Sequence, residues 1–432
     1  MNKSIWYDDI EISNFNDLKG DIKTDVAIIG GGLAGILTAY FLKQNGIECV
    51  ILEKNRICSG TTGNTTAKIT YQHGLIYSKI LNTKGKEIAK GYLNANIDAF
   101  NNFKKLCKDI DCDFEIKDNY VHSDDRAKLE VEMQALSDIG FKAELIDKPE
   151  IPVKTSGAVK FSNQAQFHPL KFIKEITKDL KIYENTFVTD IINNTVITNK
   201  GKVNAEKIIV TTHFPFIDKH GFYFIKLYQH RSYVIALKNC KIPDGMYVSD
   251  SKSGFSFRGY KDYLLLGGGG HRTGKKGGNY TEIEEFIEKN YKSAEIKFKW
   301  SAQDCISLDS IPYIGYYSKS TPNQYTATGF NKWGMTGSMV SAQILSDLIC
   351  DKDNEYLNIF KTDRSILAPQ LFVNGFEAVT NILNPFGKRC THLGCSLNWN
   401  SAEHSWDCPC HGSRFSENGN ILENPANKNL RL

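Results

Sequence analysis

The stretch DVAIIGGGLAGILTAYFLKQNGIECVILEK, residues 25–54, predicts how the N-terminal part of this chain folds. Its apolar run at 26–29 is typical of a parallel strand that is buried on both faces. A glycine-rich turn and apolar residues at helical spacing follow, and Gly46 signals a helix end before a second apolar strand at 49–52. The order strand, turn, helix, strand predicts the opening unit of a doubly wound α/β domain.

The turn has the spacing G-x-G-x-x-G at Gly30, Gly32 and Gly35. The first glycine makes the tight turn, the second lets the backbone approach a pyrophosphate, and the third lets helix and strand pack closely. The helix N-terminus offers unpaired N–H groups and a partial positive charge to the phosphates. Glu53 ends the second strand and can accept hydrogen bonds from ribose hydroxyls, which argues against a 2′-phosphate. The motif therefore predicts FAD or NAD, and the glycines alone do not separate these two.

The bulk composition is that of an ordinary globular protein of 432 residues, long enough for two or three domains. A net charge of +4, from 53 basic and 49 acidic residues, is too small to indicate nucleic acid or an anionic membrane as a partner. No apolar run reaches the roughly 18 to 20 residues of a membrane span, and the polar N-terminus lacks a signal-peptide pattern. We therefore expect a cytoplasmic protein, where clustered cysteines indicate metal or redox chemistry.

Four of the 11 cysteines lie in two short loops, CTHLGC at 390–395 and CPCHGS at 408–413. Cys390 with His392, and Cys408 with His411, each combine a thiolate and an imidazole, which suits zinc or an iron–sulfur centre. Two facing loops of this kind can give both thiolates to one iron and both imidazoles to the other, as in a Rieske [2Fe–2S] centre. A Cys2His2 zinc site and a metal-free disulfide hairpin remain open as alternatives.

The full pattern of the two loops resembles Rieske proteins of the respiratory-complex and fusion type. The resemblance implies a [2Fe–2S] cluster held by Cys390, His392, Cys408 and His411. It also implies a disulfide bond between the two remaining loop cysteines, Cys395 and Cys410. High-potential Rieske centres often carry a tyrosine where this chain has Phe415, so we expect a lower reduction potential.

Three further stretches indicate FAD through a second resemblance: SGTTGNTTAKITYQHGLIY (59–77), SLDSIPYIG (307–315) and YTATGFNKWGMTGSMVSAQILSDLI (325–349). With the glycine motif, they make residues 20–355 resemble the D-amino-acid oxidase and glycine oxidase superfamily of FAD-dependent oxidoreductases. The resemblance implies a helix N-terminus that faces the flavin pyrimidine ring, where its dipole stabilises negative charge. The implied FAD contacts are Gly30, Gly32, Leu33, Ala34, Gly35, Glu53, Lys54, Thr62, Asn64, Thr65, Val188, Gly329, Gly334, Met335 and Thr336.

We expect an α/β fold with a Rossmann-like FAD-binding domain, an antiparallel substrate-binding sheet and a small C-terminal Rieske iron–sulfur module. The oxidoreductase would span 1–360 and the module 365–432. Within the oxidoreductase, we expect FAD-binding segments near 20–80, 150–215 and 300–355, and substrate or cap segments near 81–149 and 216–299.

The segment 370–388 before the cluster loops is apolar and predicts a helix. A module this small buries little core of its own, so we expect the apolar side chains of the segment to pack on the flavoprotein. These side chains are Leu371, Phe372, Phe376, Val379, Ile382 and Leu383.

The resemblance to amino-acid oxidases also implies a substrate site. An arginine often holds the substrate carboxylate there with two parallel hydrogen bonds, and Arg258 is our first candidate, beside Arg231 and Arg272. His73 and Asp309 are further candidates, His73 facing the flavin and Asp309 on a strand that approaches it. GGGGH at 267–271 is expected to form a turn beside the flavin.

The expected function is a dehydrogenase that oxidises a small amine or amino acid at the flavin and passes electrons singly to the cluster. A one-electron acceptor or donor protein is an expected partner. Two alternatives stay open. The chain could be a reductase that runs from cluster to flavin, or a non-catalytic redox sensor built on the Cys395–Cys410 pair.

Overall fold

The glycine motif forms the centre of a mostly parallel sheet in the computed structural model, which describes residues 3–251 and 254–431. β1 (Ile22–Ile29) pairs in parallel with β2 (Cys49–Leu52) on one side and β10 (Lys202–Val210) on the other. Residues 26–29 are at most 3% exposed, because helices or loops cover both faces of the strand. α1 (Leu33–Gln44) connects β1 to β2, so the predicted βαβ unit is confirmed.

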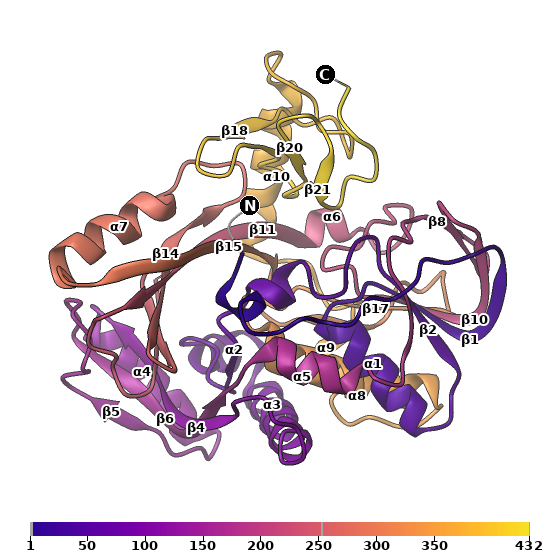
Figure 1. Cartoon of the computed structure of the whole chain (residues 1–432). Coiled ribbons are helices and arrows are strands. Elements are labelled where there is room, and N and C mark those ends of the chain that lie inside the picture. The colour runs from indigo at the N-terminus through magenta and orange to yellow at the C-terminus, as the bar shows by residue number, and fades with distance from the viewer. Residues whose placement is uncertain (1–2, 252–253, 432) are drawn as a thin grey trace.

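The first sheet has the strand order β16-β17-β10-β1-β2-β7, with β8 and β9 attached beside β10 (Figure 1). α8 packs against α1 and α3 and so covers the sheet on one face. The further elements of this layer are β7 (Lys181–Tyr183), β8 (Val188–Ile192), β9 (Thr195–Thr198), β16 (Tyr313–Tyr316), β17 (Gln324–Thr328), α3 (Lys86–Leu106), α5 (Pro169–Ile176), α8 (Gly334–Ile349) and α9 (Leu357–Phe360).

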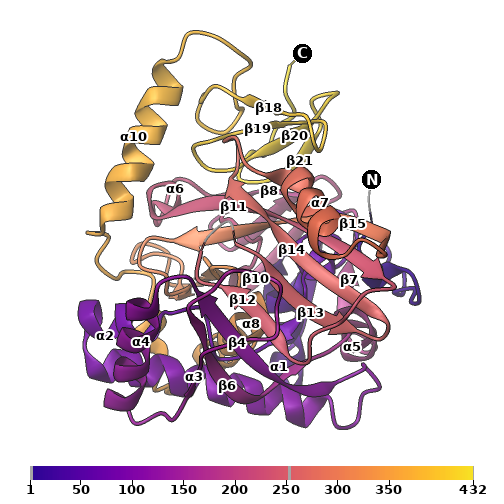
Figure 2. The same ribbon diagram turned by 90° about the vertical axis from the view of Figure 1, so that its left-hand side faces the viewer.

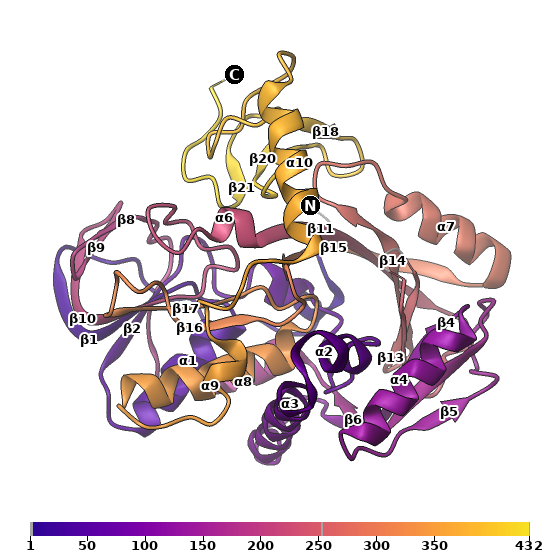
Figure 3. The ribbon, with the colours of Figure 1, turned by 180° about the vertical axis from the view of Figure 1, so that it is seen from behind.

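The second sheet is mainly antiparallel, as expected, and has the order β15-β11-β14-β13-β12-β4-β6-β3, with β5 beside β6. Helices α2 and α4 flank one end of this sheet and α7 packs on β14 (Figures 1 and 3). The elements are β3 (Lys68–Ile69), β4 (Glu115–Ser123), β5 (Glu144–Ile146), β6 (Gly157–Gln166), β11 (Leu227–Lys238), β12 (Met246–Ser249), β13 (Ser256–Tyr260), β14 (Tyr263–Arg272), β15 (Glu295–Ser307), α2 (Tyr77–Lys84), α4 (Arg126–Asp138), α6 (Tyr223–Lys226) and α7 (Asn279–Asn290).

The four glycines at 267–270 lie inside β14, so the expected turn is wrong. β14 pairs with β11 on one side and β13 on the other, with an irregularity at Gly269, where φ is +59°. The missing side chains leave room for neighbours: a Cβ on Gly268 would meet the ring of Phe255, and one on Gly267 would meet Ser256. Glycine here serves close packing between strands.

The C-terminal module is a small four-stranded sheet, β18 to β21, preceded by the predicted helix α10 (Pro369–Leu383). It lies above the edge of the second sheet formed by β11 and β15 (Figure 1). Its strands are β18 (Asn398–Asn400), β19 (Ser405–Asp407), β20 (Arg414–Ser416) and β21 (Ile421–Glu423).

The expected packing of the α10 apolar face on the flavoprotein is wrong. Phe372 is 74% exposed, Phe376 68% and Leu383 74%, while Val379 and Ile382 are also exposed and Leu371 is partly buried. Figure 2 shows α10 along the outer side of the module. Polar contacts join the module to the second sheet instead. No helix among the described residues has the length and apolar character needed to cross a bilayer.

Candidate functional site

The glycine motif builds a backbone cradle at the carboxyl end of β1. Gly30 has φ +111°, and a Cβ there would strike the carbonyl of Thr211 at the end of β10. A Cβ on Gly35 would overlap the carbonyl oxygen of Gly30, so α1 starts directly behind the turn. Glu53 accepts hydrogen bonds from the backbone N–H of Gly31 (2.8 Å) and Asn55 (2.9 Å). Burial raises the pKa of Glu53, and these two N–H groups oppose that effect.

A cavity of about 2320 Å³ opens at this cradle and runs to the second sheet and the C-terminal module. Pockets for one small ligand measure roughly 300–1,000 Å³, so this volume fits a large cofactor together with a substrate. Two expected FAD contacts, Gly35 and Gly329, do not line the cavity. Those that do are Gly30, Gly32, Leu33, Ala34, Glu53, Lys54, Thr62, Asn64, Thr65, Val188, Gly334, Met335 and Thr336.

The N-terminus of α8 lines the cavity through Gly334, Met335 and Thr336. His73 lies beside it and also lines the cavity. Its Nδ1 is 2.7 Å from the Tyr92 hydroxyl, and its Nε2 is 2.9 Å from both Thr70 O and Thr336 Oγ1. Burial lowers the pKa of His73 to about 3, so the ring is neutral and both nitrogens are occupied.

Asp309 lines the cavity, and both its carboxylate oxygens are held by Arg364 at 3.1 Å. Arg258 is not part of the cavity wall, although we expected it to hold the substrate. Its guanidinium is fully buried and donates to Gln166 and to the backbone carbonyls of Thr66 and Phe167. It therefore fastens the segment between β2 and β3 to the end of β6.

The other two candidate arginines bind the C-terminal module. Arg231 donates to Glu403 (Nε to Oε2, 3.0 Å) and to Glu423 (3.1 Å), and Arg414 of the module pairs with the same carboxylates. Arg272 donates to the carbonyls of the second cysteine loop, namely Pro409 (2.9 Å) and Cys410 (3.0 Å). Neither guanidinium is left for a substrate carboxylate.

The second cysteine loop is held by the flavoprotein at four consecutive carbonyls. Arg272 binds the first two, Gln229 on β11 donates to His411 O (2.9 Å), and Gln303 on β15 donates to Gly412 O (2.8 Å). These polar contacts replace the apolar interface that we expected from α10. The sequence offered no signal for them, because the partners are more than 100 residues apart.

The two loops share one backbone geometry. In each, a glycine with positive φ donates its N–H to the first cysteine's carbonyl, Gly394 to Cys390 (3.0 Å) and Gly412 to Cys408 (2.9 Å). The remaining cysteines, Cys395 and Cys410, are joined as a disulfide, so this implied pairing is confirmed.

The four expected cluster ligands are brought together between these loops. Cys390 and Cys408 are buried and free of disulfides, and a hydrogen bond between their thiols lowers the pKa of Cys390. The rings of His392 and His411 lie 4.9 Å apart at 88°, and the Nδ1 atom of each is buried without a hydrogen-bond partner among the described residues. Two thiols and two open imidazole nitrogens at one place fit a [2Fe–2S] centre of Rieske type.

The histidine side of this site faces the flavoprotein. His411 packs against the rings of Phe214 and Phe224, and the His392 side chain is only 3% exposed. With Nδ1 left for a metal, Nε2 of His392 carries the hydrogen and donates it to Asp218 (2.8 Å). Sequence reasoning missed Asp218, which lies 174 residues from His392.

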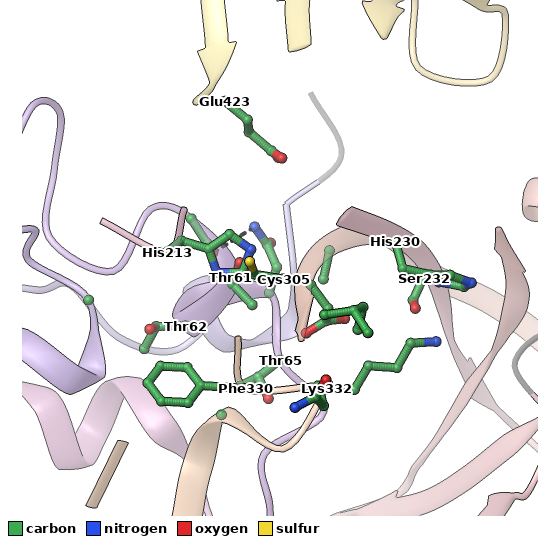
Figure 4. Close-up of a pocket in the computed structure, with 18 of the residues that line it drawn as sticks. Thr61, Thr62, Thr65, His213, His230, Ser232, Cys305, Phe330, Lys332 and Glu423 are labelled. Atoms are coloured by element: carbon green, nitrogen blue, oxygen red, sulfur yellow. Dashed lines mark hydrogen bonds between the residues drawn. The ribbon is translucent and has the colours of Figure 1, made fainter. Parts of the chain in front are cut away.

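Residues of the module also line the cavity at the cradle. Figure 4 shows Glu423 reaching from the module toward His213 and Cys305, with Thr61 and Thr62 nearby. Lys54, which follows Glu53, donates to Leu422 O (3.2 Å), and Asn424 donates to the carbonyl of Thr212 (2.7 Å). The end of β21 in the module thus borders the nucleotide cradle.

Comparison with known proteins supports both halves of this arrangement. A family model described as FAD dependent oxidoreductase, DAO, matches residues 25–348, and a Rieske [2Fe-2S] domain model matches residues 363–432. The Bacillus subtilis (strain 168) protein YhfW, whose name describes a Rieske 2Fe-2S iron-sulfur protein, is 34% identical over 99% of this chain and 97% of its own length.

Two further proteins resemble the flavoprotein part. Gamma-glutamylputrescine oxidoreductase of Escherichia coli (strain K12) is 24% identical, over 78% of this chain and 85% of its own. Glycine oxidase from Geobacillus kaustophilus superposes with a TM-score of 0.67 at 16% identity, covering 79% of this chain and 99% of that one. The latter similarity shows a shared fold.

Proposed function

The chain belongs to the DAO family of FAD-dependent oxidoreductases and carries a C-terminal Rieske domain, and on that premise we propose that it is a dehydrogenase that links the two cofactors. In this proposal it oxidises a small amine or amino acid and passes the electrons from FAD to the [2Fe–2S] cluster. FAD supplies a two-electron hydride acceptor, and the cluster supplies a one-electron carrier.

The observation that carries the proposal is the orientation of the cysteine loops. Both histidines of the site point toward the flavoprotein segment that contains Phe214, Asp218 and Phe224. The adjoining module residues, such as Glu423 and Asn424, form part of the same cavity wall as the glycine cradle. Burial of the histidine edge against the chain's own N-terminal part favours electron exchange within the chain over exchange with outside proteins alone.

The protein residues in this proposal bind, orient and exclude water. Gly30, Gly32 and the start of α1 would hold the pyrophosphate, and Glu53 the ribose. The α8 N-terminus would place its dipole at the flavin ring. Cys390, Cys408, His392 and His411 would ligate the cluster, and the carbonyl contacts from β11 and β15 would fix its position.

A relative supports the amine class of substrate. The Escherichia coli protein is named for gamma-glutamylputrescine, whose name derives from the diamine putrescine. The flavoprotein part of the chain covers most of that relative's length, and no arginine in the described cavity wall is left for a carboxylate.

An anaerobic substrate screen tests the proposal. Purified holoprotein is mixed with amines and amino acids in a stopped-flow instrument, while absorbance near 450 nm reports the flavin and freeze-quenched electron paramagnetic resonance reports the reduced cluster. We expect one class of substrate to bleach the flavin and the cluster signal to follow. A Cys408→Ser variant should bleach without producing the cluster signal.

The same instrument decides the direction of electron flow. Reduction of the flavin by a reduced ferredoxin, with no bleaching by any amine or amino acid, would contradict the dehydrogenase and favour the reductase. The sensor alternative has its own check in Cys395→Ser: substrate-driven bleaching and the cluster signal should persist if the disulfide only ties the loops.

A further inference from the structure

Arginine does not supply a carboxylate site in the cavity. Among the described residues, three arginines line the wall, and each is held by carboxylates of the protein. Arg56 pairs with Glu184 at 2.9 Å. Arg231 pairs with Glu403 and Glu423, and Arg414 pairs with those two and with Asp407.

A carboxylate, Asp304 on β15, lines the cavity instead. The face of β15 to which the Asp304 side chain points follows from the alternation of side chains along a strand. Ser301 and Gln303 point to the C-terminal module, since they bond Glu403 (2.6 Å) and Gly412 O (2.8 Å). Asp304, one residue further, therefore points to the opposite face of the sheet, the face on which Trp300 donates to Asn64 O (2.9 Å).

The neighbour of Asp304 on β11 is His230, which is its direct partner in the strand register. Directly paired residues of antiparallel strands share a face. Figure 4 shows His230 and Ser232 together on the cavity wall, with Lys332 reaching in from the turn before α8. Asp304 thus belongs to a polar patch of the cavity wall together with His230 and Ser232.

Among the described residues, the Asp304 carboxylate makes no side-chain hydrogen bond and no ion pair, and the ammonium of Lys332 is the charge that acts on it most strongly. Burial raises the pKa of Asp304 to about 6, and the positive charges of Lys332 and Arg231 partly oppose that effect. A carboxylate in such a place is costly to leave without a partner, and a bound cation with N–H donors relieves the cost.

We propose that Asp304 is the residue that selects the substrate by charge: it receives the ammonium group of a cationic amine, so the site takes amines in preference to amino acids held by their carboxylate. This inference rests on the proposed oxidoreductase function and makes its substrate class specific. The juxtaposition that carries it is a cavity-lining carboxylate outside any described hydrogen bond or ion pair, in a wall whose described arginines are all engaged by carboxylates of the protein.

Two ligands of matched shape test the charge preference without turnover. Tert-butylammonium and pivalate share the tert-butyl group, and neither has a C–H bond on a carbon that bears nitrogen. Each is titrated into the FAD-loaded full chain, and binding is followed by calorimetry and by the flavin absorbance spectrum. We expect tert-butylammonium to bind more tightly than pivalate to the unmodified protein, a comparison that needs no variant.

Asp304→Asn should weaken tert-butylammonium binding by about 10-fold to 100-fold, the range for a lost charged hydrogen bond. Asp244→Asn is the matched control, because that aspartate is 89% exposed and pairs with Lys117 at the surface. FAD content and circular dichroism check that each variant is folded.

Tighter binding of pivalate, no measurable binding of tert-butylammonium, or a change under about 2-fold in Asp304→Asn would each overturn the inference. The two proposals fail separately. If α-amino acids alone bleach the flavin and Asp304→Asn leaves their rates unchanged, the oxidoreductase stands and the role of Asp304 is refuted. If no substrate bleaches the flavin but Asp304→Asn weakens tert-butylammonium binding, the cation-binding role of Asp304 stands and the oxidoreductase proposal is refuted.

Discussion

Replacing Glu403 by glutamine tests the charge cluster that joins the C-terminal module to β11. Glu403 accepts hydrogen bonds from Arg231 (3.0 Å), Tyr233 (3.1 Å) and Ser301 (2.6 Å). Burial alone would raise its pKa, but the charges of Arg231 and Arg414 lower it from the usual 4.5 to about 2. One pKa unit corresponds to about 1.4 kcal/mol, so Glu403→Gln should cost roughly 3 kcal/mol of unfolding free energy.

Urea unfolding of the holoprotein measures this cost, with visible circular dichroism of the cluster reporting the module. A group whose folded pKa is lowered stabilises the fold above its unfolded pKa and loses that effect as pH falls through the folded pKa. The difference in unfolding free energy between the unmodified protein and Glu403→Gln should therefore be constant from about pH 8 to 5 and shrink below pH 4.5. Glu130→Gln, at an exposed surface pair, is the control and should cost under about 0.5 kcal/mol. A gap under about 0.5 kcal/mol for Glu403→Gln, or one that grows on acidification, would refute the reasoning.

Three other predictions concern the cradle, the cluster and α10. Gly35→Ala should abolish FAD binding, measured as FAD content after purification, because the added Cβ would overlap the carbonyl oxygen of Gly30. Gly375→Ala is the control and should keep FAD, because a Cβ added there meets no neighbouring segment within 4 Å. Asp218→Asn should raise the reduction potential of the cluster in an electron paramagnetic resonance titration. The negative charge of Asp218 disfavours the more negative reduced cluster, so its removal makes reduction easier; an unchanged potential would contradict this. Phe376→Ser should change the unfolding free energy by less than about 0.5 kcal/mol, since the ring is 68% exposed; a loss above about 2 kcal/mol would show that it is covered.

The local sequence determined the parts of this protein that depend on neighbouring residues. The spacing of Gly30, Gly32 and Gly35 fixes a turn, and the apolar run before it fixes a buried strand, so the βαβ unit was predictable. Each cysteine loop is likewise a local hairpin, closed by its own glycine. The family resemblance then supplied the disulfide partner of Cys395, which the structure confirms.

The tertiary structure decided what depends on residues that are far apart in the chain. Arg231, Arg258 and Arg272 have the same chemistry in sequence, yet one binds the module's carboxylates, one binds buried backbone carbonyls, and one holds a cysteine loop. The exposure of Phe376 also could not be read from its apolar pattern, because amphipathic spacing shows that a helix has an apolar face but not what covers it. A side chain's role here is set by which partners the fold brings within a few ångströms, and those partners lie in other sheets and loops whose distance no local pattern encodes.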